Sequence, residues 1–242
     1  MHEPPRSLAL ELACSSVLER PPSRLRPGVL FQEVISERYI PFGSPCPMYI
    51  AETMLGCRIR AQNVLLDVLM PILEIEPLDG AVLSQRNRNR LLRIAERIVP
   101  IVEVWRNELF YTDPAHFIHK RSHAVERLSI DHLPQTGAPE RAHAGRGEFE
   151  GAFGVVYKGE VVSYADWAAL SLLVSSIAVF TDPRYRGLGL GASVVSAATE
   201  EILHIGKVPV YFTDSRNAPS LALCQSLGYM RFGQDLWTFA GL

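Results

Sequence analysis

The chain has 242 residues, a length that allows one large domain or two small ones. With 48% hydrophobic and 21% charged residues, its composition excludes a chain that is mainly disordered. The 24 basic and 26 acidic side chains give a formal net charge of −2, which does not favour a nucleic acid or an anionic membrane as a partner. Lysine occurs only at positions 120, 158 and 207, and this bias toward arginine is typical of a GC-rich, bacterial genome.

The cysteines lie at positions 14, 46, 57 and 224 and form no CxxC pair. Scattered cysteines in a chain of this size are typical of reduced, buried thiols, which predicts a cytoplasmic protein. The first residues, MHEPPRS, lack the basic segment and apolar run of a signal peptide. The longest uncharged apolar stretch, 167–181, is shorter than the roughly 20 residues of a membrane-spanning helix. We therefore expect no membrane partner.

Residues 1–110 are expected to form a mainly helical N-terminal region, whose role the pattern does not reveal. Prolines bound a predicted helix over 8–19, and prolines with a glycine indicate a loop over 39–50. The run 64–70 is apolar on nearly all sides, which predicts a buried element without distinguishing a helix from a strand. Apolar residues at helical spacing predict an amphipathic helix over 82–99.

Two groups of side chains before residue 124 resemble binding sites. The polar face of the predicted helix 82–99 carries five arginines, but no aromatic residues interleave with them. We interpret this face as solvated and expect no nucleic-acid partner. His116, His119 and His123 would share one face of a helix, but no Cys, Asp or Glu lies between them, and we expect no metal.

A second domain over 111–242 is predicted, because the pattern changes near residue 123. Alternating residues indicate a strand over 123–129, and the polar, Gly- and Pro-rich stretch 134–150 indicates a long loop. Two strands, 152–157 and 161–167, then flank the turn Lys158-Gly159-Glu160, which predicts a hairpin.

The remaining elements alternate between strands and helices. A strand over 171–181 precedes a helix over 189–205, and Gly206 follows where a left-handed residue is expected. The last elements are a strand over 208–213, a helix over 219–226 and one or two strands over 229–239. Antiparallel hairpins with two crossover helices predict an α+β fold, with a mixed and mostly antiparallel sheet flanked by helices.

A glycine-rich turn joins the strand over 171–181 to the next helix. It reads Arg186-Gly187-Leu188-Gly189-Leu190-Gly191-Ala192. Glycines let the backbone approach a bulky anion, because no Cβ intervenes. The free N–H groups and the dipole of the helix start favour negative charge, so the turn is expected to bind a diphosphate.

Two nucleotide-binding folds use such a turn. A Rossmann domain would fit Gly187, Gly189 and Ala192, with Asp214 following at a strand end. However, five residues separate the strand from Gly187, and the 28 residues after Asp214 are too few to complete a dinucleotide-binding fold. We therefore favour the second fold.

That second fold is the GNAT superfamily of N-acetyltransferases, which residues 123–242 resemble through two motifs in register. The family's R/Q-x-x-G-x-G/A motif, often preceded by V-x-P-x-Y/F, matches the sequence TDPRYRGLGLG over 181–191. Its downstream motif N-x-x-A/S-x-x-L-Y-x-x-x-G-F/Y matches NAPSLALCQSLGY over 217–229. No second glycine turn occurs in the first hundred residues, so a tandem pair of GNAT domains is not expected.

The resemblance implies that this chain binds acetyl-CoA as the acyl donor. The backbone of Val179, Phe180 and Thr181 would pair with the pantetheine arm, and one N–H group would polarise the thioester carbonyl. Asn217 would also bond to the pantetheine arm. The diphosphate would lie on the turn, whose binding residues would be Arg186, Gly187, Leu188, Gly189, Leu190, Gly191 and Ala192.

The catalytic groups are less clearly implied, because the sequence departs from the family at two positions. Cys224 stands where many members have a Tyr that protonates the leaving thiolate, and Phe212 stands where some have a Glu base. A Cys could donate a proton, but a buried Cys in an apolar helix face is the interpretation that we favour. Asp166 and Asp214 are the remaining candidates for a base, together with a water chain.

We therefore expect an acyl-CoA-dependent N-acyltransferase, which would transfer acetyl to a primary amine by direct attack in a ternary complex. A GNAT-fold module that binds acyl-CoA without catalysis is the alternative, because both expected side chains are absent. The expected partners are acetyl-CoA and an amine-bearing acceptor. The N-terminal region could wall the acceptor site or form a homodimer interface.

Overall fold

The computed structural model describes residues 7–26, 28, 30–36, 44–129, 131, 133 and 148–241. Within these residues the strands form one ten-stranded mixed sheet, in the order β1-β3-β2-β10-β4-β9-β8-β7-β6-β5. Seven of its nine neighbouring pairs are antiparallel, and only β1–β3 and β8–β9 are parallel. The predicted α+β class and mostly antiparallel sheet are confirmed.

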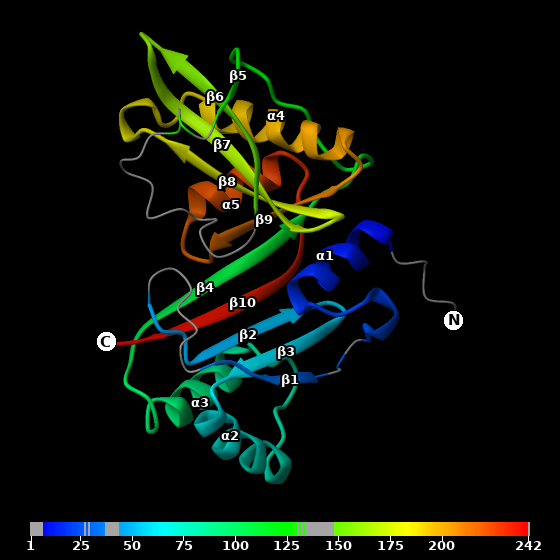
Figure 1. Cartoon of the computed structure of the whole chain (residues 1–242), viewed down its shortest axis with the longest axis vertical. Coiled ribbons are helices and arrows are strands. Elements are labelled where there is room, and N and C mark those ends of the chain that lie inside the picture. The colour runs from blue at the N-terminus through cyan, green and yellow to red at the C-terminus, as the bar shows by residue number, and fades with distance from the viewer. Residues whose placement is uncertain are drawn as a thin grey trace.

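The first half of the chain builds one side of this sheet (Figure 1). Its helices are α1 (Leu8–Leu18), the short η1 (Pro22–Arg24), α2 (Asn63–Ile75) and α3 (Gln85–Ala95). Its strands are β1 (Leu30–Val34), β2 (Met48–Thr53), β3 (Gly56–Ala61) and β4 (Ile101–Tyr111). Helices therefore share this region with four strands that the sequence pattern did not predict.

The second half builds the other side. Its strands are β5 (Glu126–Leu128), β6 (Glu148–Tyr157), β7 (Glu160–Ser171), β8 (Val174–Thr181), β9 (Val208–Asp214) and β10 (Met230–Ala240). Its helices are the short η4 (Pro183–Tyr185), α4 (Leu190–His204) and α5 (Ala218–Ser226). Both predicted crossover helices are confirmed within one residue at each end, and the predicted hairpin is confirmed with strands that extend four residues further at their outer ends. The positive φ of Lys158 and Gly159 forms the hairpin turn, and Gly206 is left-handed as expected.

Several boundaries differ from the sequence-based predictions. Strand β2 begins at Met48, inside the predicted loop 39–50, and the amphipathic helix is shorter than 82–99. The ambiguous run 64–70 is helical, and Val64 and Val68 on its outer side are exposed rather than buried. The tip of the predicted loop, 134–147, lies outside the described residues, while 148–150 belong to β6.

Strands β4 and β10 join the two sides of the sheet. β10 lies between β2 and β4 and is antiparallel to both, so the last strand of the chain is inserted among strands of the first half. β4 in turn pairs with β9 of the second half. Figure 1 shows β4 and β10 crossing the middle of the molecule side by side. The predicted division near residue 110 falls at the end of β4, within this continuous sheet.

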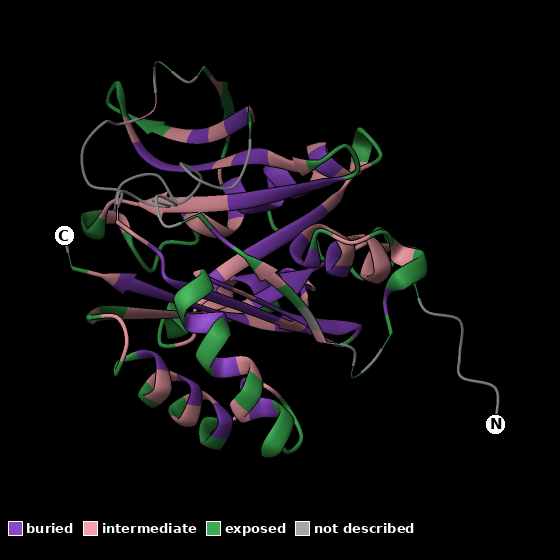
Figure 2. Ribbon diagram, turned by 60° about the horizontal axis from the view of Figure 1, so that its bottom comes forward, coloured by how far each residue is buried: buried purple, intermediate pink, exposed green. Residues whose placement is uncertain are grey.

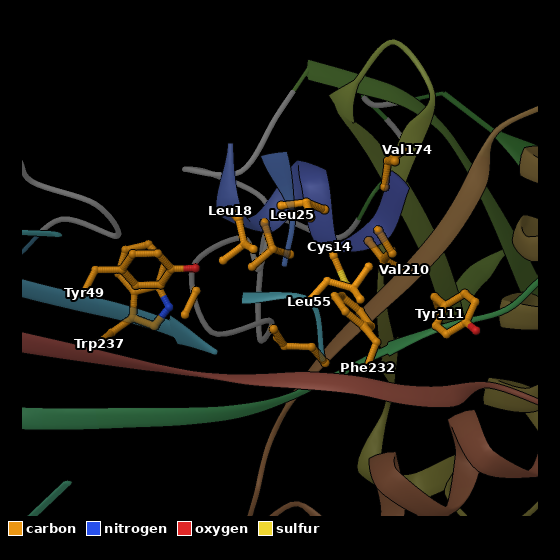
Figure 3. Packing of buried hydrophobic residues seen from close by; sticks show 14 of the residues in the cluster. Cys14, Leu18, Leu25, Tyr49, Leu55, Tyr111, Val174, Val210, Phe232 and Trp237 are labelled. Carbon is orange, nitrogen blue, oxygen red and sulfur yellow. The ribbon is translucent and has the colours of Figure 1, made fainter. Parts of the chain in front are cut away.

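Three buried clusters cover the sheet. Side chains of β2, β3 and β10 pack with α2 and α3 in one cluster, and those of β7, β8 and β9 pack with α4 and α5 in a second. A third cluster lies on the opposite face, where α1 covers the centre of the sheet; Figure 3 shows Cys14 and Leu18 of α1 beside Leu55 and Phe232. Figure 2 shows that the strands are mostly buried, whereas the helices alternate between buried and exposed residues. The core therefore runs through both halves.

All four cysteines are free and buried, as the sequence predicts. Burial raises the pKa of the Cys46 thiol to about 12, so this group remains protonated near neutral pH. Among the helices described by the structure, none is long and apolar enough to cross a bilayer.

Candidate acyl-CoA site

Strands β8 and β9 separate at their carboxyl ends. Their parallel pairing runs from Val174–Val208 to Ile177–Tyr211 and then stops, although β8 continues to Thr181 and β9 to Asp214. β8 remains paired with β7 on its other side as far as Thr181. Residues 178–181 therefore present one open backbone edge to the gap between β8 and β9, and they are only partly buried. These are the backbone groups that the sequence assigned to the pantetheine arm.

The glycine turn follows η4 and leads into α4. Gly187 and Gly189 have φ values of 80° and 81°, a conformation that glycine adopts without strain. Gly189 is the N-cap of α4 and provides no side chain for capping. A Cβ on Gly191 would lie 3.3 Å from Thr181 Oγ1, which shows that the start of α4 packs against the end of β8. The turn and the gap between the strands are thus adjacent.

The backbone N–H groups from Gly187 to Ala192 have no acceptor within the described part of the chain. The first bond of the helix is donated by Ser193 N to Gly189 O at 3.2 Å. Unpaired N–H groups at the start of a 15-residue helix carry partial positive charge and bind anions. The turn can therefore hold a diphosphate as the glycine spacing predicts.

The two arginines beside the turn are already hydrogen-bonded. Arg186 donates through Nε to the carbonyl oxygen of Thr181 at 3.2 Å, which fixes its stem between β8 and the turn. Arg184 binds Asp182 at 2.7 Å, and this hydrogen-bonded pair lowers the pKa of the partly buried Asp182 carboxyl. Arg186 therefore remains the candidate for contacting an anion, whereas the charge of Arg184 is partly neutralised.

Side chains next to the gap between β8 and β9 point alternately to the two faces of the sheet. Ala165, Trp167 and Val179 point to the buried face under α4. Tyr164 and Phe180 lie on the opposite face, with ring centroids 5.7 Å apart. A groove of about 670 Å³ adjoins this opposite face. Besides Phe180, its wall includes three acidic and two basic residues, namely Glu126, Glu160, Asp182, Arg127 and Arg184. The groove therefore carries charges of both signs, and Arg184 partly neutralises Asp182.

The two candidate bases differ in their surroundings. Asp166 is partly buried and pairs in register with Ala178, the first residue of the open edge. Asp214 lies at the end of β9, where a hydrogen-bonded pair with Arg216, 2.7 Å away, lowers its pKa. A carboxylate with a lowered pKa is a weaker base, so the Arg216 pair counts against Asp214 as the general base, whereas Asp166 lies beside the open edge.

Cys224 lies on α5 inside the core under α4. It has no exposed surface, and its Sγ lies 3.2 Å from the carbonyl oxygen of Leu221, to which the thiol can donate. Burial raises its pKa to about 12. These surroundings agree with the packing role that the sequence favoured. Asn217 is the N-cap of α5, where its Oδ1 accepts from Ser220 N at 3.2 Å and leaves the amide nitrogen for a ligand.

The three histidines at helical spacing do not share one face. His116 Nδ1 lies 2.7 Å from Asp113, and the ring of His119 packs on Phe117. His123 instead reaches the glycine turn, where its Nε2 lies 2.7 Å from the carbonyl oxygen of Leu188. Among the described residues, no group of three or more His, Cys, Asp or Glu side chains lies close enough to hold a metal. The contact of His123 was not foreseen, because nothing local in the sequence connects residue 123 to the turn.

Comparison with known proteins supports the assignment made from the motifs. Residues 152–238 match the family model of FR47-like proteins, a GNAT-related family. The match covers little more than a third of the chain. It includes β6 to β9, the glycine turn, α4, α5 and most of β10, which are the elements that form the candidate site.

Solved structures resemble the fold at low sequence identity. A Drosophila protein is 15% identical with a TM-score of 0.52, over 84% of this chain and 77% of that one. A GNAT-family protein from Novosphingobium aromaticivorans is 20% identical with a TM-score of 0.48, over 59% and 67% of the two chains. A GCN5-related N-acetyltransferase from Kribbella flavida is 19% identical with a TM-score of 0.43, over 63% and 64%. No curated protein matches the chain. The likeness to the Drosophila protein extends the shared fold into the first half.

Proposed function

We propose that the chain is an acyl-CoA-dependent N-acyltransferase that transfers acetyl from acetyl-CoA to a primary amine. The observation that carries the proposal is the open edge of β8 over residues 178–181, which leads to the unpaired N–H groups of the glycine turn. The open strand edge can form hydrogen bonds with the amides of a pantetheine arm. The unpaired N–H groups of the turn can bind the diphosphate of CoA. The GNAT-related stretch supports the same donor.

The reaction would proceed in a ternary complex. The amine nitrogen attacks the thioester carbonyl, whose developing negative charge is stabilised by a backbone N–H of residues 179–181. The C–S bond then breaks, and the thiolate leaves with the electron pair and takes up a proton. Asp166 would accept the proton from the amine, since it lies beside the first residue of the open edge. Solvent would supply the proton to the thiolate, because the thiol of Cys224 is buried and holds its proton tightly.

A module that binds acyl-CoA without turnover is the second candidate. It is favoured by Phe212 and Cys224, which replace the acid and base side chains of the resembling family. Release of CoA in the presence of a broad panel of amines would support the enzyme. Saturable acetyl-CoA binding without CoA release from any amine would support the module instead.

The donor is tested by ligand-dependent stability. Binding to the native state stabilises it by RT ln(1 + [L]/Kd), about 2.7 kcal/mol at 100 times Kd. We expect millimolar acetyl-CoA to raise the melting temperature by several degrees and NADH to have no effect. An unchanged melting temperature with acetyl-CoA would contradict the proposal, and a larger rise with NADH would favour the Rossmann interpretation.

Cellular location and assembly follow from the same proposal. We propose that the protein works in a reducing, bacterial cytoplasm, a proposal supported by the buried, free thiols and by the bias toward arginine over lysine. We propose acetyl-CoA and an amine-bearing acceptor as its partners, with the first half of the chain forming part of the acceptor side or a homodimer interface. Analytical ultracentrifugation of the whole chain would test the last point.

A further inference from the structure

A segment that precedes β5 lies along α4 and is attached to it at several points. Lys120 N donates to Ser196 Oγ at 3.0 Å, and His123 N donates to Ser193 Oγ at 3.3 Å. Arg121 forms an ion pair with Glu200. Because Ser193, Ser196 and Glu200 are spaced by three and four residues, they lie on one face of the helix. The segment 120–123 is thus held in a fixed register on α4.

The two serines allow this close approach. Both are fully buried, and their small side chains bring the backbone of the segment within hydrogen-bond distance of the helix. Ser193 Oγ also lies 3.3 Å from Ser122 Oγ. A Cβ on Gly189 would lie 3.3 Å from that same Ser122 oxygen. The segment therefore forms a wall directly behind the glycine turn.

His123 makes the contact between this wall and the turn. Its Nε2 lies 2.7 Å from the carbonyl oxygen of Leu188, which can only accept a hydrogen bond. Nε2 must therefore carry the hydrogen and act as the donor. The other ring nitrogen, Nδ1, takes no part in this bond.

This bond determines where the next N–H group points. The chain has no cis peptide among its described residues, and in a planar trans peptide the C=O and N–H bonds point in opposite directions. With the carbonyl of Leu188 turned toward His123, the N–H of Gly189 is directed away from the wall. That N–H has no acceptor within the described residues. A hydrogen bond to the carbonyl also polarises the peptide and strengthens its N–H as a donor.

We propose that His123 is a positioning residue for the diphosphate of the acyl donor. By holding the Leu188–Gly189 peptide, it keeps the Gly189 N–H aimed into the space that the diphosphate occupies. The inference rests on the proposed function, since it concerns the same donor. It adds a side chain outside both sequence motifs and outside the GNAT-related stretch 152–238.

The test compares two isosteric replacements in the full chain. In His123→Gln the side-chain amide nitrogen falls near the place of Nε2 and can donate to Leu188 O, whereas in His123→Asn it falls near Nδ1 and cannot reach. The backbone bond from residue 123 to Ser193 is retained in both variants. Acetyl-CoA affinity is measured by calorimetric titration, and the melting temperature without ligand reports on the fold.

We expect His123→Asn to weaken acetyl-CoA binding about tenfold, the effect of one hydrogen bond to a charged group. His123→Gln should remain within threefold of the wild type, and the ligand-free melting temperatures should agree within about two degrees. With an accepted amine, His123→Asn should raise KM for acetyl-CoA and leave kcat unchanged.

Three results would overturn the inference. Wild-type affinity in His123→Asn would show that the bond is not needed, and equal loss in both variants would show that the donor position is irrelevant. If His123→Asn lowered the ligand-free melting temperature together with the acetyl-CoA affinity, His123 would only stabilise the fold. Failure of the wild type to bind acetyl-CoA would instead contradict the proposed function, so the two failures are distinguishable.

Discussion

Gly189 and Gly206 have nearly the same backbone conformation but different surroundings. Their φ values are 81° and 78°, so a side chain at either position is strained by roughly 1–3 kcal/mol. Gly189 begins α4 at the candidate site, whereas Gly206 follows its other end and faces open space. Substitutions at these two glycines therefore distinguish the effect of backbone strain from the effect of losing the ligand site.

We expect Gly189→Val to abolish acetyl-CoA binding and Gly206→Val to leave it unchanged. Both variants strain the backbone, but only the first places a Cβ 3.3 Å from Ser122 Oγ, where the added side chain would push against the segment 120–123 and displace the Leu188–Gly189 peptide that would hold the diphosphate. Calorimetric titration with acetyl-CoA and a thermal melt measure the two effects. Unchanged affinity in Gly189→Val would mean that the diphosphate does not bind this turn.

A substitution at Cys224 distinguishes a role in packing, which affects stability, from a role in proton transfer, which affects turnover. Cys224→Ala removes one buried heavy atom and should cost about 1 kcal/mol of unfolding free energy. Because burial raises the thiol pKa to about 12, proton donation to a CoA thiolate of reference pKa about 8.5 would be uphill by roughly 3 units. We expect turnover to change less than tenfold. A fall of 10²-fold or more at full acetyl-CoA saturation would make Cys224 the general acid.

Asp166 in β7 and Asp214 at the end of β9 should differ in their effect on the rate of acyl transfer. Asp166→Asn should lower kcat by about 10²-fold or more, the range for a lost general base. Asp214→Asn should change kcat less than fivefold, because the Arg216 pair lowers the Asp214 pKa and keeps it ionised. The lowered pKa means that Asp214 stabilises the fold above its unfolded pKa of about 3.9 and loses this effect as the pH falls further. If the two substitutions lowered kcat equally, the assignment of Asp166 rather than Asp214 as the general base would be wrong.

Among the elements of the fold, an ion-pair cluster joins α1 to the edge strand β1 and to its neighbour β3. Arg58 on β3 is only 2% exposed and contacts both Glu19, which caps α1, and Glu33 of β1. Arg20 also binds Glu33. Burial alone would raise the pKa of Glu33, but the hydrogen bond and charge of Arg58 outweigh it and lower that pKa. The cluster therefore depends on the ionised carboxylate.

Glu33→Gln should lower the unfolding free energy by about 3 kcal/mol at pH 7, because it leaves the buried Arg58 charge partly uncompensated. Since the folded pKa of Glu33 is lowered, its contribution is present above its unfolded pKa of about 4.3 and is lost below it. Denaturant titrations at pH 7 and pH 3 should therefore show a larger difference between variant and wild type at pH 7. Gln32→Glu, an exposed change on the same strand, is the control. An equal deficit for Glu33→Gln at both pH values would contradict the role of the charge.

The sequence predicted those elements whose signals are local. The hairpin around Gly159, the glycine turn and the two crossover helices are encoded by short turn and helix-boundary patterns. β2 and β3 were missed because strands buried on both faces lack alternation, and their pairing partners lie far away in the chain. The run 64–70 of α2 was ambiguous because it is apolar on nearly all sides, so its periodicity does not distinguish a helix from a strand.

The same limit applies to the candidate site. Gly187, Gly189 and the strand before them were predicted from spacing, and the open edge of β8 agrees with that prediction. The contact of His123 with Leu188 spans 65 positions and depends on how the 120–123 segment packs on α4. Only the folded chain brings those residues together.

At the scale of the whole molecule, the inserted β10 makes each half depend on the other. β10 pairs with β2 and β4, and its Phe232, Leu236 and Phe239 are at most 2% exposed. A fragment of residues 111–242 would retain β10 without either neighbouring strand, and β9 without β4. Its unpaired strand edges and exposed apolar side chains favour aggregation.

We therefore expect the fragment 111–242 to show no cooperative thermal transition. Co-expression with residues 1–110 should restore a soluble complex, because the missing partners are then supplied. A fragment of residues 101–242, which keeps β4 with β9 and β10, should be more soluble than 111–242. A cooperative melt of 111–242 that shifts with acetyl-CoA would show that the second half is an independent domain.

The burial of all four cysteines makes the native chain almost inert toward thiol-reactive dyes. A cysteine introduced by Leu188→Cys, at a side chain that is 58% exposed, would then be the dominant site of labelling. Because its backbone lies between the imidazole of His123 and the N–H groups of the turn, a fluorophore there would respond to ligands at that position. The same inertness means that a thiol reagent added during turnover would report free CoA against a low background.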